Sequence, residues 1–256
     1  MCLIAFAWKA HPRWRLLLVG NRDEFHARPT APLAAWPDAG GMLAGRDLEA
    51  GGTWMGAAPG GRVAAVTNVR LPQDRGGDRS RGWLVRDFLA QPIAAAAHAQ
   101  ALAMQAQDYR PFNLLMFDAE AGFYLGNRPG ARLESITPGV HGLSNADFNA
   151  PWPKTKALMR ALTDWLHAGD AENFAPLWQA LGDATEWPDA LLPDTGIGIE
   201  RERMLSASFI RGADYGTRAS TLVAVGHDGS VWMIERRFGP HGRFLSQTRL
   251  SLPPHS

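Results

Sequence analysis

The sequence predicts an α+β fold in which helices pack against antiparallel sheets built from hairpins. Short apolar runs separated by turn residues dominate both ends of the chain, as hairpin strands do. Segments with helical spacing are confined to the middle, where they form two pairs. A doubly wound parallel sheet would alternate strand and helix throughout, and this chain does not. No linker, repeat or composition break divides residues 1–256, so we expect a single domain.

The first third of the chain is predicted to form two hairpins. The apolar runs 2–8 and 16–20 flank a polar turn, and both strands are expected to be largely buried. The stretch that follows, 28–50, is rich in Pro, Gly and Ala and is interpreted as a loop. The second hairpin pairs 51–56 with 63–69 around a turn that contains Pro and two glycines.

The middle of the chain begins with helices and then returns to strands. Helical spacing covers 82–89 and 93–106, and the second segment is rich in alanine, which favours helix. The runs 112–117 and 122–126 are typical of a third hairpin. A short strand is expected at 139–144, ending beside an asparagine.

Two further helices and a last hairpin complete the prediction. Helices are expected at 154–167 and 171–181, followed by a loop rich in Pro and Asp. The runs 221–226 and 231–236 flank the sequence His-Asp-Gly-Ser, which is a favourable hairpin turn.

Composition excludes several classes of function. The hydrophobic share of 46% and the charged share of 20% are those of a globular protein, and the net charge is only +1. We therefore expect no nucleic-acid partner bound through bulk charge. No apolar run approaches the roughly 18 residues of a membrane span, so no stable membrane insertion is expected. A single cysteine allows no internal disulfide, which favours a reducing, cytoplasmic location.

That cysteine, Cys2, directly follows the initiator methionine. Cysteine is small enough for Met1 to be removed, which would make Cys2 the first residue of the mature chain. Its thiol would then lie beside its own α-amino group, whose ordinary pKa of about 7.7–8.0 suits it to accept the thiol proton. One residue would supply both nucleophile and base. The alternative is that Cys2 is a small apolar residue at the start of a buried strand.

An acyl-transfer site also needs donors for an oxyanion and groups that orient the nucleophile. Asn68 and Asn145 each lie where a predicted strand ends, and an asparagine amide can donate to a developing negative charge. Asp23 could hydrogen-bond the terminal ammonium, and Arg218 could act as a fixed cation. Each has another explanation, since strand-end asparagines cap turns and an Arg22–Asp23 pair is common at surfaces.

Motifs spread over most of the chain resemble those of the NRDE family, which includes the transport and Golgi organisation protein 2 group. The family takes its name from an Asn-Arg-Asp-Glu tetrapeptide. The matching segments are Met1-Cys2-Leu3-Ile4, Gly20-Asn21-Arg22-Asp23-Glu24-Phe25, Arg28-Pro29-Thr30, Gly51-Gly52-Thr53-Trp54, Val66-Thr67-Asn68-Val69-Arg70, Gly142-Leu143-Ser144-Asn145, Pro151-Trp152-Pro153-Lys154 and Tyr215-Gly216-Thr217-Arg218-Ala219-Ser220-Thr221.

The resemblance implies the four-layer αββα fold of N-terminal-nucleophile hydrolases, with two antiparallel sheets between helices. The order of the motifs is also similar to that of penicillin V acylases and bile salt hydrolases. Those enzymes have a cysteine at position 2, an early acidic residue, two strand-end asparagines and a late arginine. Carried over motif by motif, the resemblance implies Cys2, Asp23, Asn68, Asn145 and Arg218 as catalytic residues of a hydrolase acting on a linear amide or a related acyl substrate.

One position departs from the acylase pattern. The acylases carry an arginine three residues before the aspartate, and here that position is Gly20. Arg22 is a candidate substitute and a candidate substrate-binding residue, but it alternates to the other face of a strand from Asp23. The sequence leaves open which of Arg22, Asp23 and Glu24 points into the site.

The remaining candidates concern the ligand, which we expect to be a small molecule. Trp54 follows Gly51 and Gly52, which allow close backbone approach, and is expected beside a binding pocket. Eukaryotic members of the NRDE family are linked to Golgi organisation, haem trafficking and lipid or acyl-coenzyme A metabolism. The alternative function is therefore a non-catalytic carrier that binds haem or an acyl lipid in the same cleft. His26 and His141 are ligand candidates only in principle, and no histidine pair has metal-ligand spacing, so no metal or other cofactor is expected.

Overall fold

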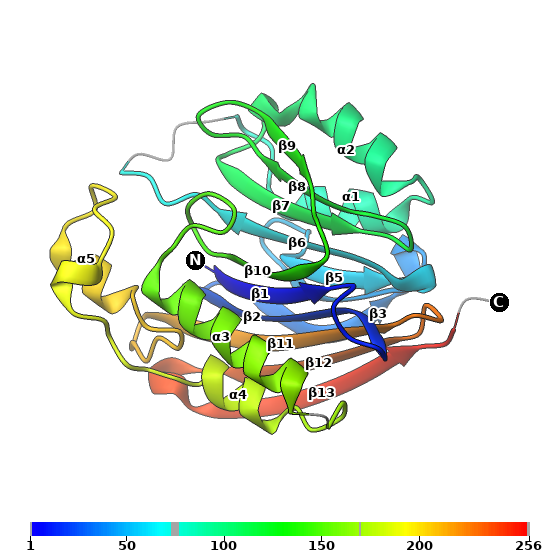
Figure 1. The fold of residues 1–256 in the computed structure, drawn as a ribbon. Helices are drawn as coiled ribbons and strands as arrows, with labels where there is room; N and C mark the ends of the chain where they lie inside the picture. The colour runs from blue at the N-terminus through cyan, green and yellow to red at the C-terminus, as the bar shows by residue number, and fades with distance from the viewer. Residues whose placement is uncertain (1, 73–76, 169, 255–256) are drawn as a thin grey trace.

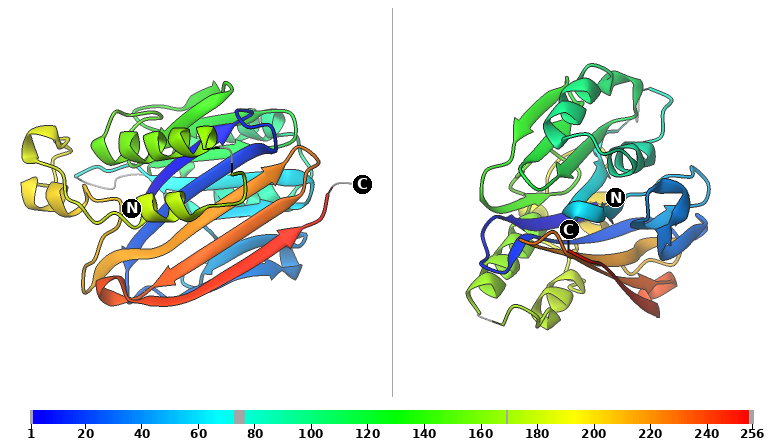
Figure 2. Two further views of the ribbon diagram at one scale, coloured as in Figure 1. Left: turned by 60° about the horizontal axis from the view of Figure 1, so that its bottom comes forward. Right: turned by 90° about the vertical axis from the view of Figure 1, so that its right-hand side faces the viewer.

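The computed structural model describes residues 2–72, 77–168 and 170–254, which form a four-layer sandwich (Figure 1). Two antiparallel sheets pack face to face in the centre, and a pair of helices covers the outer face of each. The right-hand view of Figure 2 shows the helix pairs on opposite sides of the sheets. The predicted α+β class with two antiparallel sheets and outer helices is confirmed.

One sheet has six strands in the order β10-β1-β2-β11-β12-β13, so both ends of the chain lie in it. Every neighbouring pair is antiparallel. The strands are β1 (Cys2–Trp8), β2 (Trp14–Phe25), β10 (Gly139–Leu143), β11 (Tyr215–Gly226), β12 (Val231–Phe238) and β13 (Phe244–Leu252).

The other sheet has seven strands in simple sequence order, β3 to β9. It is antiparallel throughout. Its strands are β3 (Thr30–Trp36), β4 (Met42–Asp47), β5 (Met55–Ala58), β6 (Arg62–Asn68), β7 (Phe112–Phe117), β8 (Gly122–Gly126) and β9 (Arg132–Ser135).

Helices α1 (Gly82–Ala90) and α2 (Ala95–Ala103) pack on the seven-stranded sheet, at the top of Figure 1. Helices α3 (Pro153–His167) and α4 (Ala175–Leu181) pack on the six-stranded sheet. A short helix, α5 (Ile199–Met204), precedes β11, and short 3₁₀ turns lie in several of the connections. Within the described ranges, no helix is both long and apolar enough to span a bilayer.

Burial on both faces explains the unbroken apolar run of β1. Ile4 and Phe6 point into the core between the two sheets, whereas Leu3 and Ala5 point into the core beneath α3 and α4. A strand that is covered on both sides shows no alternation with polar residues. The periodicity therefore identified a strand but could not reveal which face would meet which layer.

Four strands and one helix were missed by the sequence prediction. The segment 28–50, interpreted as a loop, contains β3 and β4, and no strand was expected at β9 or β13. Strands β3, β9 and β13 lie at sheet edges and are partly exposed, so they lack a buried apolar run. Helix α5 lies in the Pro- and Asp-rich loop. Strand β2 runs on to Phe25, so the Asn-Arg-Asp-Glu tetrapeptide lies inside the strand and not after it.

Candidate active site

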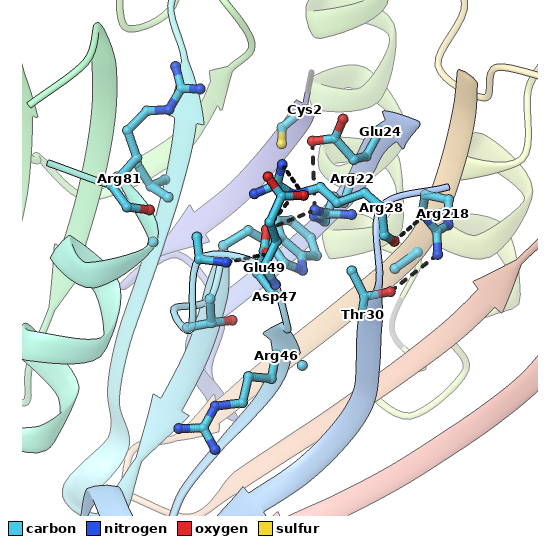
Figure 3. Close-up of a pocket in the computed structure, with 18 of the residues that line it drawn as sticks. Cys2, Arg22, Glu24, Arg28, Thr30, Arg46, Asp47, Glu49, Arg81 and Arg218 are labelled. Atoms are coloured by element: carbon cyan, nitrogen blue, oxygen red, sulfur yellow. Dashed lines mark hydrogen bonds and ion pairs between the residues drawn. The ribbon is translucent and has the colours of Figure 1, made fainter. Parts of the chain in front are cut away.

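A cavity of about 350 Å³ opens between the ends of the two sheets (Figure 3). One wall comes from β1, β2, β11 and β12, and the other from β3, β4 and β6. The predicted site residues that line it are Cys2, Arg22, Asp23, Trp54, Asn68 and Arg218. Asn145 is not among the lining residues that the structure describes.

Cys2 is the first residue of β1, and its thiol points into the cavity (Figure 3). Only 7% of the residue is exposed. Its backbone carbonyl accepts a hydrogen bond of 3.0 Å from the Ser144 hydroxyl, which ties β1 to the end of β10. Burial raises the pKa of the Cys2 thiol, although Arg22 acts in the opposite direction. At neutral pH the thiol therefore needs a base to become a nucleophile.

Arg22 and Glu24 lie on the same face of the sheet as Cys2. Arg22 is the direct cross-strand partner of Cys2, so both side chains project into the cavity. The guanidinium lies 3.7 Å from the Glu24 carboxylate and 3.6 Å from that of Asp47. This arrangement answers the question that the sequence left open: Arg22 and Glu24 point inward, and Asp23 borders the cavity from the opposite face.

The departure at Gly20 has a steric cause. A Cβ atom at Gly20 would lie 2.8 Å from the backbone oxygen of Leu3 and 3.1 Å from the Ile4 side chain. Because a backbone carbonyl within a sheet is held by its pairing, a larger residue at this position would strain the β1–β2 pair. The positive charge expected three residues before Asp23 is therefore absent at that position, and Arg22 brings one to the thiol instead.

Asp23 is anchored on the helix-facing side of β2. Its Oδ1 atom accepts a 2.7 Å hydrogen bond from the Thr217 hydroxyl, and its backbone oxygen accepts one of 3.2 Å from the Tyr215 hydroxyl. Only 1% of Asp23 is exposed. Burial raises the pKa of the Asp23 carboxyl, while the Lys154 ammonium and the Thr217 hydrogen bond favour its charged form. Asp23 is thus a buried acceptor beside the start of β1.

Lys154 is a feature of the site that the sequence reasoning missed. It lies in the first turn of α3, is 2% exposed, and donates a 2.8 Å hydrogen bond to the Leu205 carbonyl. Burial lowers its pKa to about 8, and the nearby Asp23 opposes that shift. One signal was available, because a lysine in the first turn opposes the positive end of the helix dipole and is not placed there for helix stability.

Asn145 holds Asn68 in a defined orientation. Its Nδ2 donates to the backbone oxygen of Asn68 at 2.9 Å and to the side-chain Oδ1 of Asn68 at 3.0 Å. Its own Oδ1 accepts from the Ser144 hydroxyl at 3.3 Å. Asn68 presents its oxygen to Asn145, and its Nδ2 donates a long hydrogen bond of 3.4 Å to the backbone oxygen of Val69, so one N–H of the amide remains available to a ligand in the cavity that Asn68 lines. The two predicted asparagines therefore meet, with Asn68 in the cavity wall and Asn145 behind it.

Arg218 and Trp54 reach the cavity from opposite sheets. The Arg218 guanidinium donates to the backbone oxygens of Phe25 and Arg28, at 2.6 and 3.1 Å, and to the Thr30 hydroxyl at 3.2 Å. It thus fastens the turn between β2 and β3. Trp54 is half-buried, lines the cavity and packs against the core between the sheets.

The histidines named as ligand candidates lie elsewhere. Neither His26 nor His141 belongs to the described lining of the cavity. His141 stacks on Phe6 and Phe148 at centroid distances of 5.2 and 5.3 Å. Both neighbours are apolar rings, so His141 is a packing residue in this structure.

Comparisons with known proteins agree with this architecture. Residues 1–240 match the family model described as Transport and Golgi organisation 2. A human Transport and Golgi organization protein 2 homolog is 34% identical over 255 residues, covering 92% of each chain. The Drosophila melanogaster Transport and Golgi organization protein 2 is 28% identical over 278 residues, covering 95% of each chain. A solved Caenorhabditis elegans N-acylethanolamine-hydrolyzing acid amidase ortholog shares the fold at a TM-score of 0.50 and 11% identity, covering 86% of this chain and 92% of that one.

Proposed function

We propose that this chain, which belongs to the Transport and Golgi organisation 2 family and has the fold of an N-terminal-nucleophile hydrolase, is a hydrolase. In this proposal Cys2 cleaves a linear amide or a related acyl substrate. One observation carries the proposal: the Cys2 thiol begins β1 and opens into a cavity that also receives the oriented Asn68 amide. Nucleophile and oxyanion donor in one cavity are what acyl transfer requires.

The reaction needs a base because burial keeps the Cys2 thiol protonated. After removal of Met1, the α-amino group of Cys2 takes that proton. The thiolate attacks the substrate carbonyl carbon, and the Asn68 NH₂ group donates to the oxyanion that forms. The C–N bond then breaks, and the ammonium returns its proton to the leaving amine. Water hydrolyses the thioester, which releases the carboxylic acid and restores the thiol.

The surrounding residues have positioning roles in this scheme. Asp23 holds the new N-terminus from the helix-facing side, and Asn145 fixes the direction of the Asn68 amide. Arg218 keeps the β2–β3 turn in place and adds positive charge to the cavity. The roles of Asn145 and Arg218 depend on contacts between fixed elements, which is how preorganised sites lower reaction barriers.

The test compares variants on a fluorogenic amide, octanoyl 7-amino-4-methylcoumarin. Cys2→Ala should lower turnover at least about a hundredfold, since a nucleophile is lost, and change the free energy of unfolding by no more than about 1–2 kcal/mol. Inserting an alanine between Met1 and Cys2 should also abolish turnover, because the thiol remains while the amine moves away. Equal turnover by wild type and Cys2→Ala would refute the mechanism.

Intact mass measurement of the purified protein accompanies this test. Loss of Met1 is expected, and retention of Met1 in every molecule would remove the base that the mechanism needs. The alternative carrier function predicts saturable binding of hemin or octanoate without turnover, and with the same affinity in Cys2→Ala. That result would favour the carrier.

A further inference from the structure

Seven arginines and six carboxylates of the described chain line the cavity. Three of them, Arg22, Arg28 and Arg46, pair with carboxylates. No described carboxylate lies within ion-pair distance of Arg218 or Arg237, whose hydrogen bonds go to neutral oxygens. Their charges are therefore held in place without being neutralised.

Arg218 and Arg237 converge on Thr30 and keep free donors. Arg237 uses Nη2 alone, for the Thr30 backbone oxygen at 3.0 Å and its hydroxyl at 3.3 Å. Arg218 uses Nη1 twice and Nη2 once. A guanidinium has five N–H donors, so each residue retains at least two. Neither residue has a buried nitrogen without a partner within the described chain, so the remaining donors are accessible to solvent, and both residues line the cavity.

The positive charges of Arg218, Arg22 and Arg237 repel one another across the cavity. Burial lowers the pKa of Arg218, and the positive charges of Arg22 and Arg237 lower it further. The Glu24 carboxylate opposes this lowering of the Arg218 pKa. Glu235 lies two residues before Arg237 on the same face and has another partner. Its Oε1 accepts from the Leu33 N–H at 2.8 Å, and burial raises its pKa, which disfavours the charged form. An anionic ligand group would relieve the repulsion.

These arginines lie at a fixed distance from the nucleophile. Cys2, Arg22, Ala219 and Arg237 are successive cross-strand partners on β1, β2, β11 and β12, so they form one row on one face of the sheet. Three strand spacings separate the ends of the row, about 14 Å between Cα atoms. Ala219 leaves space in the middle of the row. A β-bulge between Thr217 and Ala219 gives β11 one extra residue, Arg218, and bulges re-aim side chains in this way.

We propose that Arg237 and Arg218, with Thr30, form a subsite for an oxyanion at the far end of the acyl substrate, such as a carboxylate or a phosphate. The inference rests on the proposed function, because it places the scissile carbonyl at Cys2 and the anion roughly 10 Å away along the row. The substrate class is thus an acyl chain with an anionic end. Paired guanidiniums in fixed geometry are suited to bind such a group.

The test uses two amides that differ in one group: octanoyl and 7-carboxyheptanoyl 7-amino-4-methylcoumarin. The wild-type protein should favour the carboxylated substrate by at least tenfold in kcat/KM. Arg237→Gln should remove that preference through KM, leaving kcat and the neutral substrate unchanged within about twofold. Arg236→Gln is the matched control, because Arg236 directly precedes Arg237 in β12 and is not among the residues that line the cavity. Competition by inorganic phosphate against acetate shows which oxyanion the subsite prefers.

A binding experiment separates the two proposals. Octanedioate should bind to Cys2→Ala, and adding Arg237→Gln should weaken that binding at least tenfold. Such binding without turnover in the wild type would refute the hydrolase and leave the oxyanion subsite standing. Equal turnover of the two amides, together with octanedioate binding that does not depend on Arg237, would overturn the subsite and leave the hydrolase standing.

Discussion

The buried ion pair between Arg70 and Glu202 allows a quantitative test of how the site is held. Arg70 leaves the end of β6, donates its backbone N–H to Asn145 at 2.7 Å, and stacks over Trp152 at 4.5 Å. The side chains of Arg70 and Glu202 are 4% and 3% exposed. Nε and Nη2 of Arg70 have no partner within the described residues, so the Glu202 carboxylate is the main compensation for this buried charge.

The perturbation is Glu202→Gln, which keeps an oxygen for the hydrogen bonds from Thr195. It removes the negative charge and leaves the Arg70 guanidinium buried and uncompensated. Breaking a buried pair in this way costs about 3–5 kcal/mol. For a chain of this size, about 2–4 °C is lost per kcal/mol, so the melting temperature should fall by roughly 6–20 °C.

Urea unfolding and thermal melts measure the effect against a control ion pair that involves Arg203 of the same helix, α5. Asp189→Asn breaks the pair of Arg203 and Asp189, whose side chains are 45% and 51% exposed, and should change the stability much less than Glu202→Gln does, because solvent screens this pair. Replacing Arg70 and Glu202 together with methionine and leucine should recover most of the loss, because no buried charge remains. A loss for Glu202→Gln as small as that for Asp189→Asn would refute the reasoning.

Two further predictions concern the support of the nucleophile. Gly20→Ala should lower the free energy of unfolding by about 1–3 kcal/mol, since its Cβ would meet the Leu3 oxygen. Gly130→Ala, where no atom lies within 4 Å, is the control in the same urea titration, and equal stability of the two variants would contradict the steric account. The free energy of unfolding should rise from about pH 8 to about pH 10.5. In the folded chain Lys154 has a pKa of about 8, whereas in the unfolded chain it has its ordinary pKa of 10.5. Between these values the unfolded state binds more protons than the folded state, so stability increases with pH. The rise, up to about 3 kcal/mol at about 1.4 kcal/mol per pKa unit, should vanish in Lys154→Met, and an unchanged profile in that variant would show that Lys154 does not cause it.

Local patterns predicted the central strands well and the sheet edges poorly. The predicted runs 112–117 and 122–126 coincide with β7 and β8, because strands in the middle of a buried sheet need continuous apolar sequence. Strand β13 alternates between exposed and half-exposed residues, and its pairing with β12 holds it in the sheet. An edge strand needs only one partner, so its sequence carries a weaker signal.

The sequence by itself determined the fold class, the family and the identity of the candidate nucleophile. It also named Asn68 and Asn145 together, because both lie where predicted strands end. Only the tertiary structure decided that Asn145 lies behind Asn68 and that Lys154 lies beside Asp23.

The row from Cys2 to Arg237 was likewise beyond the sequence. Its members come from four strands at opposite ends of the chain. Shifting one strand by a single residue would turn its side chain to the other face of the sheet. Register of this kind is set by long-range pairing and by the bulge at Arg218, which local periodicity does not encode.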